Sequence, residues 1–302
     1  MIKSITVTNY LGDRLKLELA RPELSGFVVK SVTGLGPGKA NINTSEVTTT
    51  DGGLFNSSRL PVRNVVLSLE FLFGSSIEDT RQKSYKYFPL KRQVTLLVET
   101  DNRVAEITGY VESNDPTIFS KKEGSDISII CPDPHFYSAG KDGVISTTFY
   151  GAEPLFEFPF CSEPNMELSA VRKVAERSLM YTGDAETGVT IRIHATGEAS
   201  NITIRHRNLD TNGSIHIDTD RLKTLTGSAI IAGDDVIIST ARGNKFAKLV
   251  RDGQTILILN CLGKNTNWFR LVKGENAFSY EAEEGIANLN VSIENRVLYE
   301  GV

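Results

Sequence analysis

The residues that could do chemistry in this 302-residue chain are few and widely spaced. Four histidines stand at His135, His194, His206 and His216, and the last three lie in segments where they alternate with apolar residues. Such alternation is typical of half-buried strands, so we expect these three imidazoles to face solvent. Histidines on neighbouring strands could surround zinc, but none of them has a local partner at zinc-ligand spacing. The histidines therefore predict no metal site.

The carboxylates and thiols form no catalytic constellation either. Two couplets of adjacent carboxylates occur, Asp234-Asp235 and Glu283-Glu284, and neighbouring residues of a strand point to opposite faces. We expect both couplets to lie in solvated turns. The cysteines are Cys131, Cys161 and Cys261. They lack CxxC spacing, which favours buried free thiols, and no GxSxG elbow occurs, so we predict a protein that is not an enzyme.

Two further motifs could bind a ligand. Residues 33–40 (TGLGPGKA) depart from the phosphate-binding pattern GxxxxGK[ST] at Thr33 and Ala40, and Pro37 lacks an N–H donor, so no nucleotide or other cofactor is expected. Trp268, the single tryptophan, begins an expected strand, residues 268–272. An exposed indole ring could stack on a sugar, whereas a covered one belongs to a core or an interface. Both interpretations of Trp268 stay open.

The elements that must position these residues are mostly strands. Val, Ile and Thr number 22, 24 and 26, against 17 Ala, and β-branched residues favour the sheet. The net charge of -4 lacks the basic excess of a nucleic-acid binder. No apolar run approaches the ~20 residues of a membrane span, and no signal peptide is visible, so we expect synthesis in a cytoplasm without membrane insertion. Composition thus predicts a mainly β protein.

The length predicts two domains, which we place at residues 1–140 and 141–302. The first carries 16 basic and 16 acidic residues, and the second carries 17 and 21. In the first domain one short helix is expected, with a capping box from Ser75 to Glu78 and an inward face of Ile77, Arg81, Tyr85 and Phe88. The second domain alternates with period two from residue 189 onward, and residues 165–177 are interpreted as strand. This pattern favours an antiparallel β-sandwich, with a tight hairpin turn at Asp252-Gly253.

A long polar stretch, residues 34–63, interrupts the first domain. It is rich in Gly, Asn, Ser and Thr, but apolar residues such as Phe55 and Leu60 are spaced along it. A loop of this length inside a domain is usually functional or an extended arm. We therefore expect either an extended arm or a flexible or inter-subunit loop.

Several segments together resemble the distal tail (Dit) protein family of siphovirus-type bacteriophages. In the first half these are GLGPGKANIN (34–43), TDGGLFNSSRLPVRNVVLSLEF (50–71) and ICPDPHFYS (130–138). In the second half they are YTGDAETGVTIRIHATGE (181–198), DDVIISTARGNK (234–245) and the W-F-x-L-x-x-G-x-N-x-F-x-Y run at 268–280. The segments follow the family's order over nearly the whole chain.

The resemblance implies a homo-hexameric ring at the tail tip or baseplate of a virion, assembled in the host bacterial cytoplasm. The first domain forms the ring (belt), and the second is galectin-like. Such a ring joins the tail tube protein to the tail-associated hub protein and to the host-adsorption apparatus, including receptor-binding proteins. In this chain we expect Phe55 and Leu60 to be buried against a neighbour, with Arg59 and Arg63 pairing carboxylates across the interface.

Other interpretations of the chain stay open. The sandwich could instead be a carbohydrate-binding module for host cell-wall recognition, with Trp268 stacking on the sugar. A phage-tail-like bacteriocin particle would use the same component. The sequence also leaves open whether its last residues, LYEGV (298–302), pack on the first domain.

Overall fold

The computed structural model describes residues 1–46, 51–72, 76–120, 122–140, 143–150, 152–154, 169–171, 175–208 and 211–302. These residues are mainly strand, which confirms the predicted fold class. They divide into two compact units, unit 1 (residues 1–143 with 298–302) and unit 2 (residues 144–297). The segment 298–302, which the sequence analysis assigned to the second domain, therefore belongs to the first unit.

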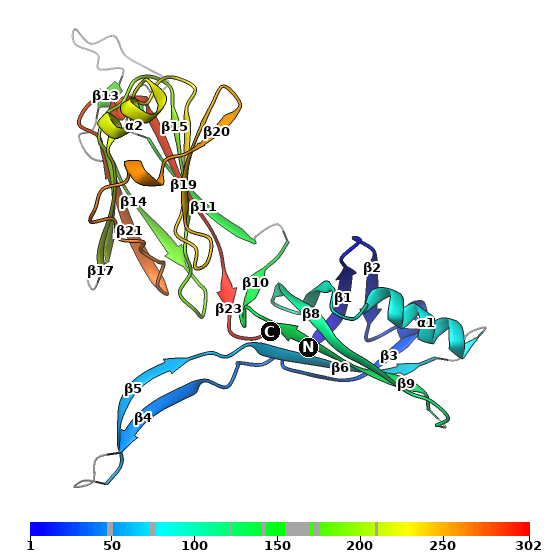
Figure 1. Ribbon diagram of the computed structural model, residues 1–302. Helices are drawn as coiled ribbons and strands as arrows, with labels where there is room; N and C mark the ends of the chain where they lie inside the picture. Colours follow the sequence, from blue (N-terminus) through cyan, green and yellow to red (C-terminus); the bar gives the residue numbers. More distant parts are fainter. Residues whose placement is uncertain are drawn as a thin grey trace, which may run out of the picture. The chain divides into compact units, whose positions relative to one another are not determined.

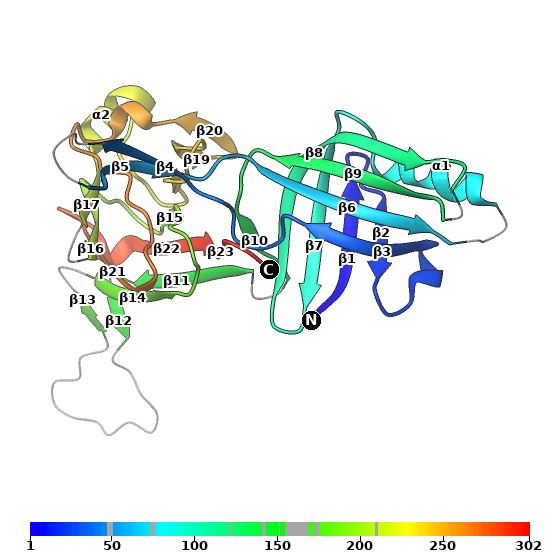
Figure 2. The same cartoon turned by 90° about the horizontal axis from the view of Figure 1, so that it is seen from below.

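Unit 1 is built on one antiparallel sheet (Figure 2). In pairing order its strands are β2 (Arg14–Glu18), β1 (Ile2–Asn9), β7 (Gln93–Thr100), β8 (Val104–Thr117), β9 (Gly124–Cys131), β6 (Arg63–Phe71) and β3 (Phe27–Thr33). A further strand, β10 (Phe136–Ser138), pairs with β8 and with β23 (Leu298–Tyr299). This pairing is what ties residues 298–302 into unit 1. A short 3-10 turn, η1 (Pro22–Leu24), precedes β3.

Strand alternation sets the core of unit 1. Alternate residues of β6 are buried, and β7 and β9 of the same sheet repeat this pattern. The buried side chains include Val65, Leu67, Leu69, Leu96, Ile107, Ile127 and Ile129. Each fully buried side chain of this size stabilises the fold by about 1.5–3 kcal/mol. The same period-two pattern therefore predicts both the strands and the face that they bury.

Helix α1 (Ile77–Tyr87) lies where the sequence places it, with two differences in detail. Its N-cap is Ser76, whose hydroxyl accepts from the Asp79 N–H at 3.4 Å, and Ser75 lies outside the described residues. Tyr85, expected inside, is 42 % exposed, whereas Ser84 and Phe88 are buried. At about 100° per residue, positions 84 and 88 align with Ile77, but position 85 points about 80° away.

Unit 2 is a sandwich of two antiparallel sheets (Figure 1), as the sequence predicts. One sheet pairs β11 (Val144–Tyr150), β22 (Leu289–Arg296), β15 (Thr190–Ala195), β18 (Asp235–Ser239), β19 (Phe246–Arg251) and β20 (Gln254–Leu257). The other pairs β14 (Ala175–Tyr181), β21 (Gly274–Glu281), β16 (Ile202–Asn208) and β17 (Thr211–Ile217). The buried hydroxyl of Tyr280 on β21 donates to the Leu289 carbonyl at the start of β22 at 3.0 Å, which links the two sheets.

The remaining elements of unit 2 are short. They are β12 (Ala152–Pro154) paired with β13 (Ser169–Val171), η2 (Leu259–Cys261), η3 (Ile286–Asn288) and helix α2 (Thr219–Thr226). Strand β13 and the start of β14 confirm the strand interpretation of 165–177 for its described residues. The hairpin turn at Asp252-Gly253 is confirmed, with φ of 51° and 75° as a type I′ turn requires. The strand expected at residues 268–272 is wrong, because only Leu271 forms an isolated bridge there, with Thr187.

Candidate assembly surface

A two-stranded hairpin extends from unit 1 (Figure 1), and we call it the arm. It consists of β4 (Asn41–Glu46) and β5 (Gly53–Arg59), and every residue of both strands is exposed. Among the described residues, neither strand pairs with a third. Both outer edges of the arm therefore keep backbone N–H and C=O groups that another strand could pair with. An isolated hairpin is only marginally stable in water, so such a structure gains most from a partner.

The arm presents apolar side chains to solvent. Phe55 lies directly opposite Thr44, and Ile42 is two residues before Thr44, so Ile42 and Phe55 share one face. Each of these two side chains is 65 % exposed. Leu54 lies on the other face and is 63 % exposed. We call Ile42, Thr44 and Phe55 the apolar face of the arm.

The sequence analysis named four residues for an interface, and the structure places them differently. Phe55 and Arg59 lie on the exposed strand β5, where a neighbouring molecule could reach them. Leu60 follows at the root of the arm and is half-buried. Ile42 was not among the named residues, although its place in the polar stretch was visible in the sequence. Its pairing across the hairpin, which only the structure gives, is what sets it beside Phe55.

Arg63 has a role inside its own unit, which corrects the expected pairing with a carboxylate of a neighbour. It is 6 % exposed. Its guanidinium donates to the carbonyls of Pro134, Gly34, Gly36 and Glu300 at 2.5–2.7 Å. Burial lowers the pKa of the Arg63 guanidinium, although an arginine with this many acceptors remains charged. The residue is therefore committed to holding unit 1 together.

Trp268 is half-buried in an irregular segment of unit 2. The Lys245 ammonium lies 5.6 Å from the centre of its ring. This distance is typical of a cation–π contact, so the Lys245 ammonium occupies one face of the indole ring. The next residue, Phe269, is the one that enters the core, at 3 % exposure.

The histidines and cysteines among the described residues do not gather into a site. His206 is 1 % exposed, and the expectation that it faces solvent is wrong. His194 lies in a surface pair with Asp235, at 2.8 Å. In the described part of the chain, no group of three His, Cys, Asp or Glu side chains is arranged to hold a metal ion. Cys131 and Cys261 are buried free thiols, as expected. Burial raises the pKa of Cys131 to about 11. Cys161 lies outside the described residues.

Asp234 is buried, which corrects its expected place in a solvated turn. Its side chain is 1 % exposed and pairs with Arg251, which is 12 % exposed. Arg251 Nε and Nη2 reach the two carboxylate oxygens at 2.8 and 2.5 Å, and the same guanidinium donates to Ala229 and Ser228. The hydrogen bond to Asp234 raises the pKa of Arg251. This fully bonded pair fastens the turn before β18 to strand β19 and offers no free group for acid–base chemistry.

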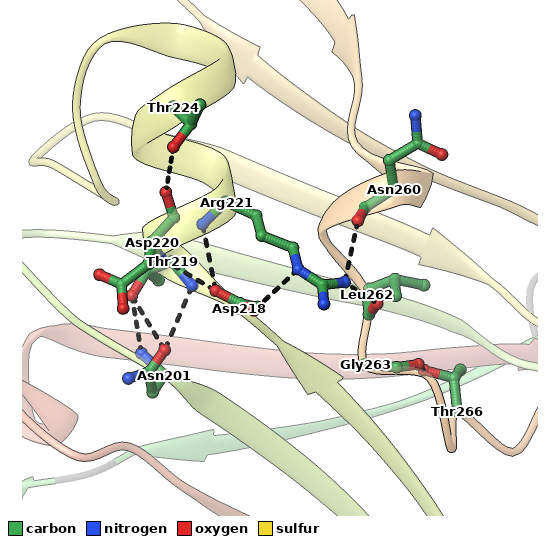
Figure 3. Close-up of polar contacts among 10 residues, drawn as sticks. All are labelled: Asn201, Asp218, Thr219, Asp220, Arg221, Thr224, Asn260, Leu262, Gly263 and Thr266. Atoms are coloured by element: carbon green, nitrogen blue, oxygen red, sulfur yellow. Dashed lines mark hydrogen bonds and ion pairs between the residues drawn. The ribbon is translucent and has the colours of Figure 1, made fainter.

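Figure 3 shows a second polar cluster, around helix α2, which the sequence analysis missed. The Asp218 carboxylate caps the helix by accepting from the N–H groups of Asp220 and Arg221 at 3.1 Å. Gly227 ends the helix in the left-handed conformation, at φ 84°. An acidic N-cap and a glycine after the last turn are sequence signals of a short helix. The Asn201 side chain also bonds Thr219, so the cluster stabilises the start of α2.

No family model matches the chain, and no curated protein matches it. Among solved structures it is similar to the SPP1 Dit protein (gp 19.1), with a TM-score of 0.65 and 14% identity. That protein is described as a paradigm of the hub adsorption apparatus in phages that infect Gram-positive bacteria. The match covers 96% of this chain and 98% of that one. The chain shares the fold of the Dit protein. A component of the phage P2 baseplate is also similar, with a TM-score of 0.51, 11% identity, and 98% and 99% of the two chains covered.

The likeness to the Dit fold extends through both units, because almost no part of either chain is left out. The resemblance that the sequence motifs indicate is thereby confirmed at the level of the fold. By their descriptions, the first neighbour belongs to a phage hub adsorption apparatus and the second to a phage baseplate. Within the described residues, none of the helices is both long and apolar enough to span a membrane.

Proposed function

We propose that this protein is a distal tail component of a phage virion or related particle, and that six copies form a ring through unit 1. The observation that carries the proposal is an exposed arm on a chain with the Dit fold over nearly its whole length. In this proposal the ring joins the tail tube to the tail-associated hub protein and the host-adsorption apparatus. Unit 2 is the galectin-like domain of the ring subunit, and the protein works by assembly, without catalysis.

The arm supplies what a ring contact needs. A neighbour that covers its apolar face removes Ile42 and Phe55 from water, and each such side chain contributes about 1.5–3 kcal/mol when fully buried. The free strand edges allow backbone pairing with the neighbour as well. A contact between an arm and a different surface of the next copy is heterologous, and its repetition closes a ring when the rotation from copy to copy returns to the first copy. Residues 1–140 carry equal numbers of basic and acidic groups, so copies approach without net repulsion.

The test is a double substitution on the arm, Ile42→Asp with Phe55→Asp. Both positions are exposed, so the subunit should fold normally, while two charges would have to be desolvated on assembly. We expect native mass spectrometry to give rings for the parent chain and monomers for the variant. A matched control is Leu24→Asp on η1, which is 62 % exposed and should leave rings intact. Rings of unchanged size and stability in the double variant would refute the arm as the ring contact.

A carbohydrate-binding function for unit 2 has no comparable support. Its one candidate residue, Trp268, is half-buried and has Lys245 over its ring. A sugar would have to use the other face of the indole or displace that ammonium group. We therefore keep ring assembly as the single proposed function.

A further inference from the structure

A buried arginine joins the two roots by which the arm is attached to unit 1. The first root, residues 34–40, follows β3, and the second, residues 60–62, precedes β6. Arg63 begins β6 and donates from Nη1 to the carbonyls of Gly34 and Gly36, at 2.6 and 2.5 Å. These two bonds fix the first root against the start of β6, where the second root ends. One guanidinium therefore holds the first root next to the residue where the second root ends.

The segment 298–302 packs into the same junction. Arg63 Nη2 donates to the Glu300 carbonyl at 2.7 Å, and the Val302 N–H donates to the Leu35 carbonyl at 3.0 Å. Gly301 is packed so closely that a Cβ on it would come within 3.0 Å of backbone atoms of residues 35–37. The first root of the arm is thus held between Arg63 and residues 300–302.

The remaining contacts of Arg63 anchor this junction to the body of unit 1. Nε donates to the Pro134 carbonyl at 2.6 Å, and the guanidinium carbon lies 4.9 Å from the centre of the Phe136 ring. Strand β10, which contains Phe136, pairs with β8 of the main sheet and with β23 of the segment 298–302. Arg63 in this way ties the arm root to the sheet, together with the Val302–Leu35 backbone hydrogen bond and the buried side chain of Leu35.

The chemistry of the junction demands arginine. The four acceptors are carbonyls from three separate segments, and a guanidinium carries five N–H donors in a rigid planar fork that reaches all of them. A lysine ammonium has three donors on one atom and cannot span the same set. Because the acceptors are neutral backbone groups, the geometry of the fork rather than a charge pair holds the roots.

We propose that Arg63 is the positioning residue of the arm, and that with residues 298–302 it forms a lock that sets the direction in which the apolar face is presented to a neighbouring copy. The role in assembly rests on the proposed function. The lock itself is a property of the single subunit and can be measured without any ring.

The experiment measures the distance between spin labels on cysteines introduced at Ser57 in the arm and Gln93 on β7, both exposed positions. Cys161 is replaced by Ser, and the two other native thiols are buried. The parent chain should give one narrow distance distribution. The narrow distribution should be lost in Arg63→Lys and in a chain ending at Val297, with thermal unfolding still cooperative. The matched control, Arg59→Lys, changes an exposed arginine four residues away and should keep the distribution narrow.

The proposal would be overturned by an Arg63→Lys variant that folds and still gives a narrow distribution of label distances. Where Arg63→Lys fails to fold, Gly301→Ala is the milder test, because the atoms nearest to its added methyl are backbone atoms of residues 35–37. An unchanged distribution in that variant would overturn the proposal equally. A parent chain that never forms rings would refute the proposed function, yet the label distances would still decide whether the lock exists.

Discussion

Acidification should destabilise unit 2 through one buried imidazole, that of His206. The ring lies 4.7 Å from Phe278 and 5.4 Å from Phe269, measured between ring centres. Its Nε2 is 3.2 Å from Asn276 Oδ1, which also accepts from the Val272 N–H, so Nε2 carries the proton. Nδ1 is buried and has no hydrogen-bond partner. A second proton would therefore place a charge on a buried imidazole that packs against two aromatic rings, with no acceptor for the new N–H.

The sign and the limit of this effect follow from proton linkage. Burial lowers the pKa of His206 from its ordinary value of 6.5, so below that pH the unfolded chain binds a proton that the folded chain does not. Above pH 6.5 this effect takes nothing from the free energy of unfolding of unit 2. That free energy falls as the pH drops from 6.5 toward the pKa of His206 in the folded state. One proton gives a slope of at most about 1.4 kcal/mol per pH unit.

The assay is urea unfolding between pH 7.5 and 5, followed by the fluorescence of Trp268, which lies in unit 2. The comparison is His206→Phe, which retains an aromatic ring packed against Phe269 and Phe278 but cannot titrate. The other histidines are present in both proteins, so their contributions cancel in the difference. We expect the free energy of unfolding to fall more steeply with acid in the parent chain. Equal slopes for the two proteins would refute the reasoning.

Two further predictions concern unit 2. Arg251→Met should lower the free energy of unfolding of unit 2 by about 3–5 kcal/mol, because the Asp234 carboxylate then stays buried without its cation. A loss under about 1 kcal/mol in urea titrations would contradict the buried pair. Trp268→Ala in the full chain should leave the signal on a glycan array unchanged, because Lys245 already uses the ring; clean glycan binding that this substitution abolishes would instead support the carbohydrate-binding alternative.

Much of the fold follows from period-two alternation, because burial favours one face of each strand. The same rule also predicts that the His206 side chain is buried. Ile202 and Ile204 on β16 face the core, and His206 occupies the next alternate position of the same strand. The polar chemistry of imidazole obscured that signal in the sequence analysis. Helix α2 was likewise readable from Asp218 and Gly227 at its two ends.

The polar interior could not be predicted in the same way. Arg63 meets the Glu300 carbonyl across 237 positions of sequence, and no local pattern marks a backbone acceptor that distant. Asp234 and Arg251 lie 17 positions apart, just before β18 and at the end of β19, and the pairing register of these two strands decides whether they meet. The polar stretch with spaced apolar residues did predict an exposed arm. The burial of the Arg63 side chain at the root of this arm could be known only from the tertiary structure.

The central claim is that copies of this chain close into a ring through unit 1. The most direct measurement is the mass of the purified full chain over a range of concentrations, with negative-stain images of the same samples. The account predicts a species of six subunits with six-fold symmetry, at higher concentration or once the tail tube protein is added as a template. A monomer under all of these conditions would contradict it.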